Sequence, residues 1–377
     1  MKRIFTFLTI IGSLSLLAQG GKSDGKIFNL LIGTGSSPGK AQGIFVYSFN
    51  TETGEFTAKS EMTTHKNPNY FAISKDRKNV YAVGEGADGV INSFSFNAAS
   101  GELTFINNAS AGGPGPCYVS IDNNKKFVFV GNYSGGSLTA IPINADGSLG
   151  QGVQNIPHSG SSVVKPNQEK PHVHAAVLSP DNRYLYAPDL GTDKVNIYNV
   201  DYSKAKPLAP AIQPFVSVAT GGGPRHFTFH PNGKFAYVIH ELSGDVTGYD
   251  YADGKLTEKQ RVSMSPSDFT GKVSAADIHI SPDGKFLYGS MRGDRHELGI
   301  YSIDKKGKLT FVGRQSTLGK APRNFSLDPS GNFLLAANQD SDEVVIFKRD
   351  KKTGLLTDTG KRIPVGRPMC LKFAAVD

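Results

Sequence analysis

The sequence predicts an all-β fold in which a unit of about fifty residues recurs, and three observations support this prediction. One motif appears six times, as an alternating apolar run, a Pro-Asp-Gly-like turn and a second apolar run that ends in polar residues. Glycine and proline are abundant, at 43 and 21 residues, which suits many short strands joined by tight turns. Apolar residues make up 38% of the chain and recur periodically, which excludes a disordered protein.

The six copies follow one another at a nearly constant spacing. They begin at Asn67, Gly115, Pro171, Gly223, Ser274 and Ala321. The turn proline, or the residue in its place, is Lys75, Asn123, Pro180, Pro231, Pro282 or Pro329, so successive turns are 48, 57, 51, 51 and 47 residues apart. A unit of this length holds four short strands and their turns, which is typical of one blade of a β-propeller.

The copy from Gly223 shows the expected strands most clearly. Its strands are expected near residues 226–229, 235–239, 246–250 and 256–263, and apolar residues alternate in the first three. A period of two residues indicates strands rather than a helix. A solenoid of stacked sheets is the alternative architecture for such repeats.

The two ends of the chain together supply a seventh blade. The segment from Leu30 to Asn50 lacks an inner strand and its turn, and the segment from Gly366 to Asp377 is an inner strand with nothing after it. Joining them closes the ring and covers an otherwise exposed sheet edge, which argues against the solenoid. We therefore predict one all-β domain at residues 21–377, a seven-bladed β-propeller with the first blade closed by the C-terminal strand.

The first residues have the composition of a cleavable signal peptide. Lys2 and Arg3 precede an apolar run from residue 4 to residue 17, and the small-residue stretch Ala-Gln-Gly follows. A run of about 14 apolar residues is too short to span a bilayer comfortably, which disfavours a membrane anchor. We therefore expect a signal peptide at residues 1–20 and a periplasmic or secreted mature protein, with a cytoplasmic protein as the alternative.

Cysteine content and charge exclude several other classes of protein. Cys117 and Cys370 fall in inner strands of units that are not neighbours, so we expect two unpaired, buried cysteines. The formal net charge of +8 is spread along the chain, without the dense basic stretch that nucleic-acid binding requires. The expected partner is a small anionic molecule, and we expect a monomer without nucleic acid and without a membrane span in the mature protein.

Aligning the copies brings unlike side chains to one end of the central channel. Six residues before the turn position stand Asn69, Cys117, His174, Arg225, Ala276 and Arg323, with Met369 in the split blade. Ten residues after it stand Glu85, Tyr133, Leu190, Glu241, Arg292 and Gln339. Both positions are equally far from the centre of the hairpin, so antiparallel pairing places them at the same end.

The charges at these two positions predict a binding site for an anion. Several ionisable groups that converge on one concave surface are costly unless they pair or bind a ligand, and inter-blade salt bridges are the alternative explanation. Substrate contacts are expected from these positions and from the position directly before the second one. The expected substrate-binding residues are Arg323, Asn132, Asp189, Asn338 and Glu85.

The longest spacing between turns contains a polar loop, from His158 to His174. A long loop at a channel mouth is typical of a lid or a pocket wall, and a tolerated surface insertion is the alternative. His172 and His174 would share one face of a strand, but the spacing fixes no third metal ligand. We therefore expect no metal, and no motif indicates another cofactor.

Four segments resemble a known family. They are HVHAAVLSPDNRYLYAPDL from His172, GGGPRHFTFHPNGKFAYVIHEL from Gly221, AADIHISPDGKFLY from Ala275 and PRNFSLDPSGNFLLAANQ from Pro322. Through them the chain from Lys26 to Asp377 is similar to the seven-bladed lactonases, which comprise the propeller type of 6-phosphogluconolactonase and the related carboxy-cis,cis-muconate cyclases. The match is specific for the family but less so for the substrate, because both branches share these segments.

The resemblance implies hydrolysis of a sugar lactone, 6-phosphogluconolactone or a related aldonolactone, without a metal or organic cofactor. The residues that match the family's proposed active site are His174, Arg225, Glu241 and Arg292. Of these, His174 or Glu241 would be the general base, and the arginines would hold the substrate anion and the developing oxyanion. The alternatives are a cyclase or isomerase acting on an unsaturated carboxylic acid, and a non-catalytic propeller that binds a glycan or a protein.

Two positions depart from the family pattern. His240 stands before Glu241 where an asparagine is more usual. Asn167 stands before Gln168 in the long loop, where relatives often have an arginine. The second departure removes a cation that would bind phosphate through two oxygens at once, so it weakens the case for a phosphorylated substrate.

Overall fold

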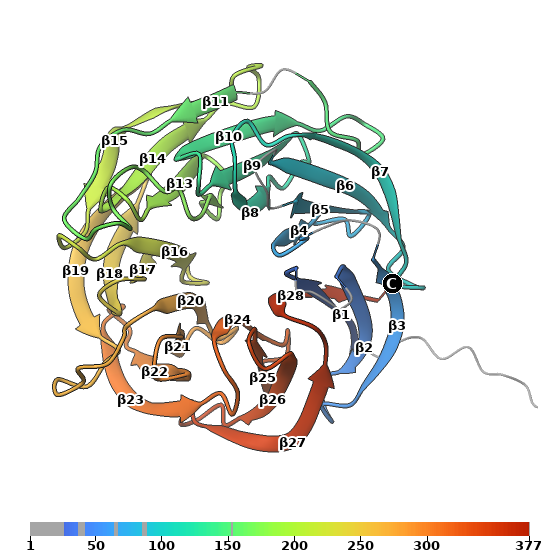
Figure 1. Cartoon of the computed structure of the whole chain (residues 1–377), viewed down its shortest axis with the longest axis vertical. Coiled ribbons are helices and arrows are strands. Elements are labelled where there is room, and N and C mark those ends of the chain that lie inside the picture. Colours follow the sequence, from blue (N-terminus) through green and yellow to red (C-terminus); the bar gives the residue numbers. More distant parts are fainter. Residues whose placement is uncertain (1–25, 37–41, 64–66, 85–88, 152–153, 377) are drawn as a thin grey trace, which may run out of the picture.

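Seven four-stranded antiparallel sheets stand around a central axis like the blades of a propeller (Figure 1). The computed structural model describes residues 26–36, 42–63, 67–84, 89–151 and 154–376. Within these ranges the regular elements are strands, and no helix there is long and apolar enough to cross a membrane. The predicted seven-bladed, all-β fold is confirmed, whereas the expected signal peptide at residues 1–20 lies outside the described residues.

Within each sheet the strands succeed one another from the axis to the rim. The split sheet consists of β28 (Pro368–Ala375), β1 (Ile27–Thr34), β2 (Ile44–Asn50) and β3 (Phe56–Met62). The next two consist of β4 (Phe71–Ile73), β5 (Asn79–Gly84), β6 (Val90–Phe96) and β7 (Leu103–Ser110), and of β8 (Pro116–Ile121), β9 (Phe127–Asn132), β10 (Ser137–Pro142) and β11 (Gln154–Pro157).

The remaining four sheets repeat the same order. Two of them consist of β12 (Val177–Leu178), β13 (Tyr184–Asp189), β14 (Lys194–Val200) and β15 (Leu208–Ser217), and of β16 (Pro224–Phe229), β17 (Phe235–His240), β18 (Asp245–Ala252) and β19 (Lys255–Ser263). The last two consist of β20 (Ala275–Ile280), β21 (Phe286–Met291), β22 (Glu297–Ile303) and β23 (Leu309–Ser316), and of β24 (Pro322–Leu327), β25 (Phe333–Asn338), β26 (Glu343–Arg349) and β27 (Leu356–Pro364).

The turn between the first two strands of a blade explains the repeated motif. Between β16 and β17, the backbone N–H of Gly233 donates to the carbonyl of His230 at 2.9 Å. Gly233 has a φ of 68°, a left-handed conformation that glycine adopts without strain. The same position has positive φ in all six copies, at Arg77, Lys125, Asn182, Gly233, Gly284 and Gly331. The six aligned turns are therefore equivalent in conformation, as the alignment of the copies assumes.

β28 closes the ring by pairing with β1, as the sequence predicts. The pairing brings Leu371 opposite Ile32 and Phe373 opposite Leu30, although these residues come from the two ends of the chain. Phe333 of the neighbouring sheet packs in the same apolar cluster, so the closing strand also attaches the split blade to the blade before it. In Figure 1 the red β28 lies beside the blue β1.

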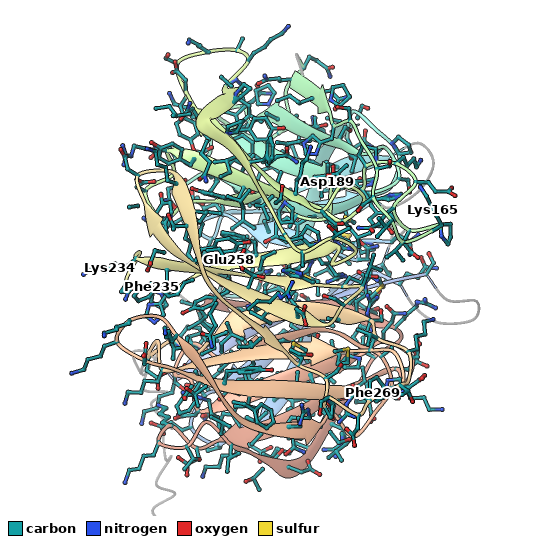
Figure 2. The ribbon with its side chains drawn as sticks, turned by 90° about the vertical axis from the view of Figure 1, so that its left-hand side faces the viewer. Lys165, Asp189, Lys234, Phe235, Glu258 and Phe269 are labelled. Carbon is teal, nitrogen blue, oxygen red and sulfur yellow. The ribbon has the colours of Figure 1, made fainter. Side chains whose placement is uncertain are left out.

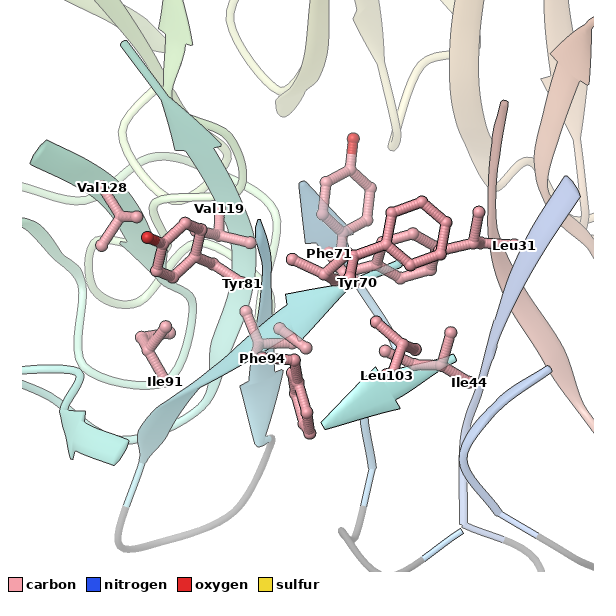
Figure 3. Packing of buried hydrophobic residues seen from close by; sticks show 14 of the residues in the cluster. Leu31, Ile44, Tyr70, Phe71, Tyr81, Ile91, Phe94, Leu103, Val119 and Val128 are labelled. Carbon is pink, nitrogen blue, oxygen red and sulfur yellow. The ribbon is translucent and has the colours of Figure 1, made fainter. Parts of the chain in front are cut away.

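Neighbouring blades adhere through apolar clusters of this kind, one of which appears in Figure 3. Leu31 and Ile44 of the split blade pack there with Phe71 and Phe94 of the next blade. In the picture the hydroxyl of Tyr70 points away from the other labelled residues. The flat sides of the blades therefore form the core, while the first strands leave some side chains for the channel.

Two further expectations about the chain are confirmed. The strands β16, β17, β18 and β19 correspond to the four ranges expected in the copy from Gly223. Cys117 and Cys370 are both buried, and neither forms a disulfide. Since they lie on β8 and β28, which belong to sheets separated by a third, no disulfide joins them.

Truncating Leu371 should destabilise the whole ring, because this residue is 1% exposed and links the two chain ends. We expect Leu371→Ala to lower the free energy of unfolding by about 2–5 kcal/mol, through lost burial and the cavity that remains. Leu355→Ala is the matched control, since Leu355 is 47% exposed, and should change the free energy by less than about 0.5 kcal/mol. Urea unfolding measures the free energy of unfolding of both variants. Equal effects of the two substitutions would contradict the role of the closing strand in stabilising the ring.

Candidate active site

The candidate site lies at the end of the channel where the outer strand of one blade connects to the inner strand of the next. Figure 2 views the ring from its side and shows Lys165 and Phe269, which belong to two such connections, on the face opposite to Lys234. Lys234 belongs to a turn between the first two strands of a blade. Glu241 and Arg292 directly follow β17 and β21, so they lie on the face of Lys165.

A cavity of about 250 Å³ opens at this end of the channel. It is lined by Cys117, Tyr133, His174, Glu241 and Arg323. A narrower space below it is bordered by Arg225 and again by Arg323. His174, Glu241 and Arg323 of this lining are residues that the sequence predicts for the site. Glu85, which was also predicted, lies outside the described residues.

Irregular pairing at this end directs side chains toward the axis. In β16 the register shifts between Pro224 and His226, so that Arg225 is an extra, bulged residue. The same shift occurs around Cys117 in β8 and around Arg323 in β24. A β-bulge bends the strand and redirects its side chains, and here the redirected side chains border the channel.

The bulge also corrects the pairing expected from the sequence. Pro224 pairs with His240. The backbone N–H of Glu241 donates to the carbonyl of Gly223 at 2.7 Å, so Glu241 does not lie directly opposite Arg225. The two residues still meet at one end, because Arg225 bulges out of the ladder and Glu241 is the first residue beyond β17.

Glu241 holds two guanidinium groups from neighbouring blades. Its Oε2 lies 2.8 Å from Nε of Arg225, and its Oε1 lies 3.0 Å from a terminal nitrogen of Arg292. The Arg225 contact is an ion pair without a well-aligned hydrogen bond at Nε, and another nitrogen of Arg225 donates to the carbonyl of Ala276. The Arg225 side chain is 2% exposed, so Glu241 rather than water compensates its charge.

His174 lies beside this ion pair. Its Nε2 is 3.9 Å from Oε2 of Glu241, and its Nδ1 is 3.7 Å from the sulfur of Cys117. The ring also contacts Tyr133 edge-on, with 5.2 Å between the centroids. Burial, followed by the positive charge of Arg225, holds the pKa of His174 well below its usual range, so the imidazole is neutral at neutral pH.

The same contacts set the charge of the other groups. Burial by itself would raise the pKa of Glu241, but Arg292, Arg225 and Arg323 outweigh it and hold that pKa below its ordinary value. Burial, together with the neighbouring Arg292, lowers the pKa of Arg225 to about 9, which leaves Arg225 charged at neutral pH. The site therefore combines one neutral imidazole, one bound carboxylate and three guanidinium groups.

Two of the expected substrate-binding residues, Asn132 and Asn338, point into their blades instead of the cavity. Asn132 donates to the carbonyl of Ala111 at 2.9 Å, and Asn338 donates to the carbonyl of Thr317 at 2.9 Å. Both carbonyls belong to connections that arrive from the preceding blade. Successive side chains of a strand point to opposite faces. Asn132 directly precedes the cavity residue Tyr133, so its side chain holds the connection and does not reach a ligand in the cavity. The same holds for Asn338, which occupies the equivalent place in its blade.

Asp189 likewise fixes a connection, the long loop at residues 158–174. Its carboxylate lies 2.8 Å from Nδ1 of His158, and it is fully buried. In the same loop the buried amide of Gln168 donates to the carboxylate of Asp193 at 2.7 Å. These bonds hold the loop in place at the mouth, which supports a pocket wall over a lid and takes Asp189 out of the substrate-binding set.

Cys117 and Tyr133 line the cavity, although the predicted site assigned no function to either of them. They occupy the same two aligned positions as the other site residues, which is the signal that could have found them. Tyr133 stacks on His172 with 4.3 Å between the ring centroids, and its carbonyl lies 2.8 Å from Nδ1 of His172. In the part of the chain that the structure describes, no three His, Cys, Asp or Glu side chains gather as metal ligands.

A second buried carboxylate, Asp277, lies deeper in the channel. It accepts hydrogen bonds from Nδ1 of His226 at 2.7 Å and from Nε2 of His279 at 2.9 Å, and Asn324 donates to it as well. Burial, followed by a nearby guanidinium, lowers the pKa of His226 to about 4, so its ring is neutral. The His226 ring meets His174 edge-on at 5.5 Å between centroids, so this network supports the floor of the cavity.

His240, one of the two residues that depart from the family pattern, is buried without a full set of partners. Its Nε2 lies 3.1 Å from the hydroxyl of Thr247, and its Nδ1 has no hydrogen-bond partner among the described residues. Burial lowers the pKa of His240 to about 4. At the equivalent position of two other blades, Asn132 and Asn338 each donate a hydrogen bond to a backbone carbonyl of the connection from the preceding blade. His240 does not make this hydrogen bond.

Replacing His240 with asparagine should make the protein more resistant to acid. Below pH 6.5 the unfolded chain protonates this histidine, while the folded chain does not until about pH 4, so unfolding becomes more favourable as the pH falls through that window. At pH 4.5 this costs about 3 kcal/mol of folding stability. Urea unfolding at pH 7.5 and 4.5 should show a smaller loss in His240→Asn, and the partly exposed His230→Asn is the control. Equal losses in all three proteins would contradict the assignment.

Comparisons with known proteins agree with this geometry. The family model described as "Lactonase, 7-bladed beta-propeller" matches residues 29–373. A 6-phosphogluconolactonase of Bacillus subtilis is 37% identical over 340 residues, which cover 89% of this chain and 95% of the relative. A 6-phosphogluconolactonase of Formosa agariphila is 37% identical over 352 residues, which cover 91% and 99%. The solved structure of a periplasmic gluconolactonase from Pseudomonas aeruginosa superposes with a TM-score of 0.89 at 37% identity, over 93% of this chain and 100% of that one.

Proposed function

The chain belongs to the seven-bladed β-propeller lactonase family, and we propose that it hydrolyses a sugar lactone, 6-phosphogluconolactone or a related aldonolactone, in the cavity at the channel mouth. One observation supports this choice of site. A neutral imidazole, His174, lies 3.9 Å from a carboxylate, Glu241, that two guanidinium groups hold in place. Lactone hydrolysis needs a base that activates water and positive charge near the developing oxyanion, and the cavity contains groups of both kinds.

We assign the general base to His174 rather than to Glu241. Each oxygen of Glu241 is within 3.0 Å of a guanidinium nitrogen, and these contacts reduce its capacity to take up a proton. His174 is unprotonated at neutral pH because its pKa is held low by burial and then by Arg225. The 3.9 Å between His174 and Glu241 is a separation that one water molecule can bridge.

In the proposed step, the water oxygen bonds to the carbonyl carbon of the lactone while its proton passes to Nε2 of His174. The carbonyl oxygen becomes an oxyanion, which Arg323 and Arg292 stabilise. The bond between this carbon and the ring oxygen then breaks, and the ring oxygen takes the proton from His174. Between the two transfers, the carboxylate of Glu241 stabilises the imidazolium of His174.

Arg225 differs in function from the other two arginines. Its side chain is 2% exposed and contacts Glu241 and the carbonyl of Ala276, so it anchors the carboxylate instead of binding substrate. Arg323 lines the cavity, and the Arg292 side chain is 15% exposed. These two are therefore the arginines that we assign to the anionic groups of the substrate and to the oxyanion.

The substrate class extends to lactones with and without a phosphate. The relatives described above carry the names 6-phosphogluconolactonase and gluconolactonase, so their names support both. Asn167, where relatives often have an arginine, is exposed in the wall of the mouth and provides no charge for a phosphate. We therefore expect binding to depend mainly on the lactone and its hydroxyls.

Replacing Glu241 with glutamine should lower kcat/KM by about 10²–10³-fold on both 6-phosphogluconolactone and gluconolactone, because the amide neither fixes the arginines nor stabilises the imidazolium. Glu297→Gln is the matched control. Glu297 also lies between two arginines, Arg295 and Arg314, but it is not part of the cavity lining. Activity of the wild type no higher than the buffer rate, or equal losses in both variants, would refute the proposed site.

The pH profile should identify His174 as the base. Its pKa lies well below the usual value of about 6.5, so kcat/KM is expected to stay constant from pH 8 down through 6.5 and to fall only in more acidic solution. The rate of spontaneous hydrolysis is subtracted at each pH. An inflection near pH 6.5, or a His174→Asn variant that keeps the wild-type rate, would rule out this assignment.

Three expectations from the sequence stay predictions. They are export through a signal peptide, a monomeric state and activity without a metal. The periplasmic location of the Pseudomonas aeruginosa relative is consistent with export. The small lactone remains the partner for which the family and the cavity both argue.

A further inference from the structure

The channel has a second cavity at its other end, which we call the lower cavity. It has a volume of about 290 Å³ and lies between the inner strands β28, β4 and β8. Its lining includes Tyr70, Tyr118, Ser120 and Lys372. On each inner strand these residues come after the site position and closer to the turn that faces away from the candidate active site, so the two cavities belong to opposite faces of the ring.

A layer of aromatic rings separates the lower cavity from the candidate active site. Tyr70 and Tyr118 stack with 4.3 Å between their centroids. His226 meets them edge-on, at 6.0 Å from Tyr70 and 5.5 Å from Tyr118. Tyr70 borders the lower cavity on one side and, on the other, the narrow space that also contacts Arg225. The residues that line the lower cavity therefore differ from those to which we assign lactone hydrolysis.

Lys372 places a positive charge in this cavity without a carboxylate in direct contact. Its Nζ donates to the hydroxyl of Tyr70 at 3.4 Å and lies 5.0 Å from the centre of the Tyr70 ring. No carboxylate of the described residues lies within salt-bridge distance of it. The carboxylate of Asp277 on β20 already accepts hydrogen bonds from His226 and His279. An ammonium group in such a place gains from an anion that can reach it.

Ser120 adds a second polar group that has no protein partner. Its Oγ is buried, and no hydrogen-bond partner for it exists in the described part of the chain. Ser326 occupies the same position of the repeat on β24, but its hydroxyl donates to the carbonyl of Leu327 at 3.4 Å, and it does not line the cavity. A buried hydroxyl without a partner is unfavourable, so a ligand oxygen beside Ser120 would stabilise the cavity wall.

Apolar side chains contribute part of the remaining wall. The partly exposed side chains of Ile73, Ile121 and Phe373 belong to it, whereas those of Phe71 and Val119 are buried between the blades. An aldonate carries a hydroxyl on most of its carbons, and the apolar part of the wall leaves such hydroxyls without partners. The volume is near the lower limit of cavities that hold small organic molecules. The product of the proposed lactonase reaction is therefore a poor match for the lower cavity.

We propose that the lower cavity binds a small organic carboxylate with an apolar body, such as an aromatic acid. The carboxylate would lie at Lys372 and accept a hydrogen bond from Ser120, while the body of the ligand packs between the apolar walls and the ring of Tyr70. This site is independent of the lactonase assignment, since it shares no residue with the proposed catalytic group.

The test is a calorimetric titration of the full-length protein with benzoate. We expect one saturable site in the wild type. Affinity should fall by at least about tenfold in Lys372→Met, which keeps the length of the side chain but not its charge, and by several-fold in Ser120→Ala. Ser326→Ala is the matched control and should bind benzoate like the wild type. Gluconate should not compete.

Three further outcomes distinguish this site from the catalytic one. Arg323→Met should still bind benzoate, and benzoate should not compete with the lactone in the hydrolysis assay. Lys372→Met and Ser120→Ala should keep the wild-type melting temperature and lactone hydrolysis. Absence of saturable benzoate binding overturns the proposal, and so does binding that survives in Lys372→Met but disappears in Arg323→Met. Neither result affects the lactonase assignment.

Discussion

The ion pairs of Glu241 with Arg225 and Arg292 are the interaction on which the mouth of the channel depends. The two guanidinium groups come from neighbouring blades, and the charge of Arg292 disfavours that of the buried Arg225. One carboxylate between them offsets this repulsion and fixes both side chains. Without it, the buried charge of Arg225 and the partly buried charge of Arg292 would lack compensation, which costs far more than the intact pair gains. Burial, followed by the positive charge of Arg225, lowers the pKa of His174 and keeps its imidazole neutral.

The repeat made most of the fold predictable, because a blade must show its strands through a period of two and its turns through glycine or a substitute. Gly233 and the residues equivalent to it all adopt the left-handed turn that the alignment implies. The repeat could also place Glu241, Arg225 and His174 at one end. It could not reveal that Asn132 points into its blade, since the pairing of the hairpin depends on bulges that leave no mark in the apolar pattern.

A further group of channel residues, which the sequence did not single out, lies one place further along the inner strands than the bulged residues. Tyr70, Tyr118, His226 and Asp277 occupy this position in four blades and fill the middle of the channel. Tyrosine and histidine occur in ordinary β-sheet cores as well, so their types alone did not attract attention. The signal that marks them is the same as at the mouth, because equivalent places in the repeat carry unlike side chains at this depth of the channel as well.

Some positions of the inner strands contribute side chains to the channel, while the other positions and the flat sides of the blades carry the packing that holds the ring together. Leu371 and Phe333 illustrate the second group, and Arg225 and Lys372 the first. A change of residue at a channel position therefore alters the chemistry at one depth of the channel with little effect on the core. This separation explains how a ring of nearly identical hairpins can have a charged cavity with a neutral base at one end and a cavity with a single lysine at the other.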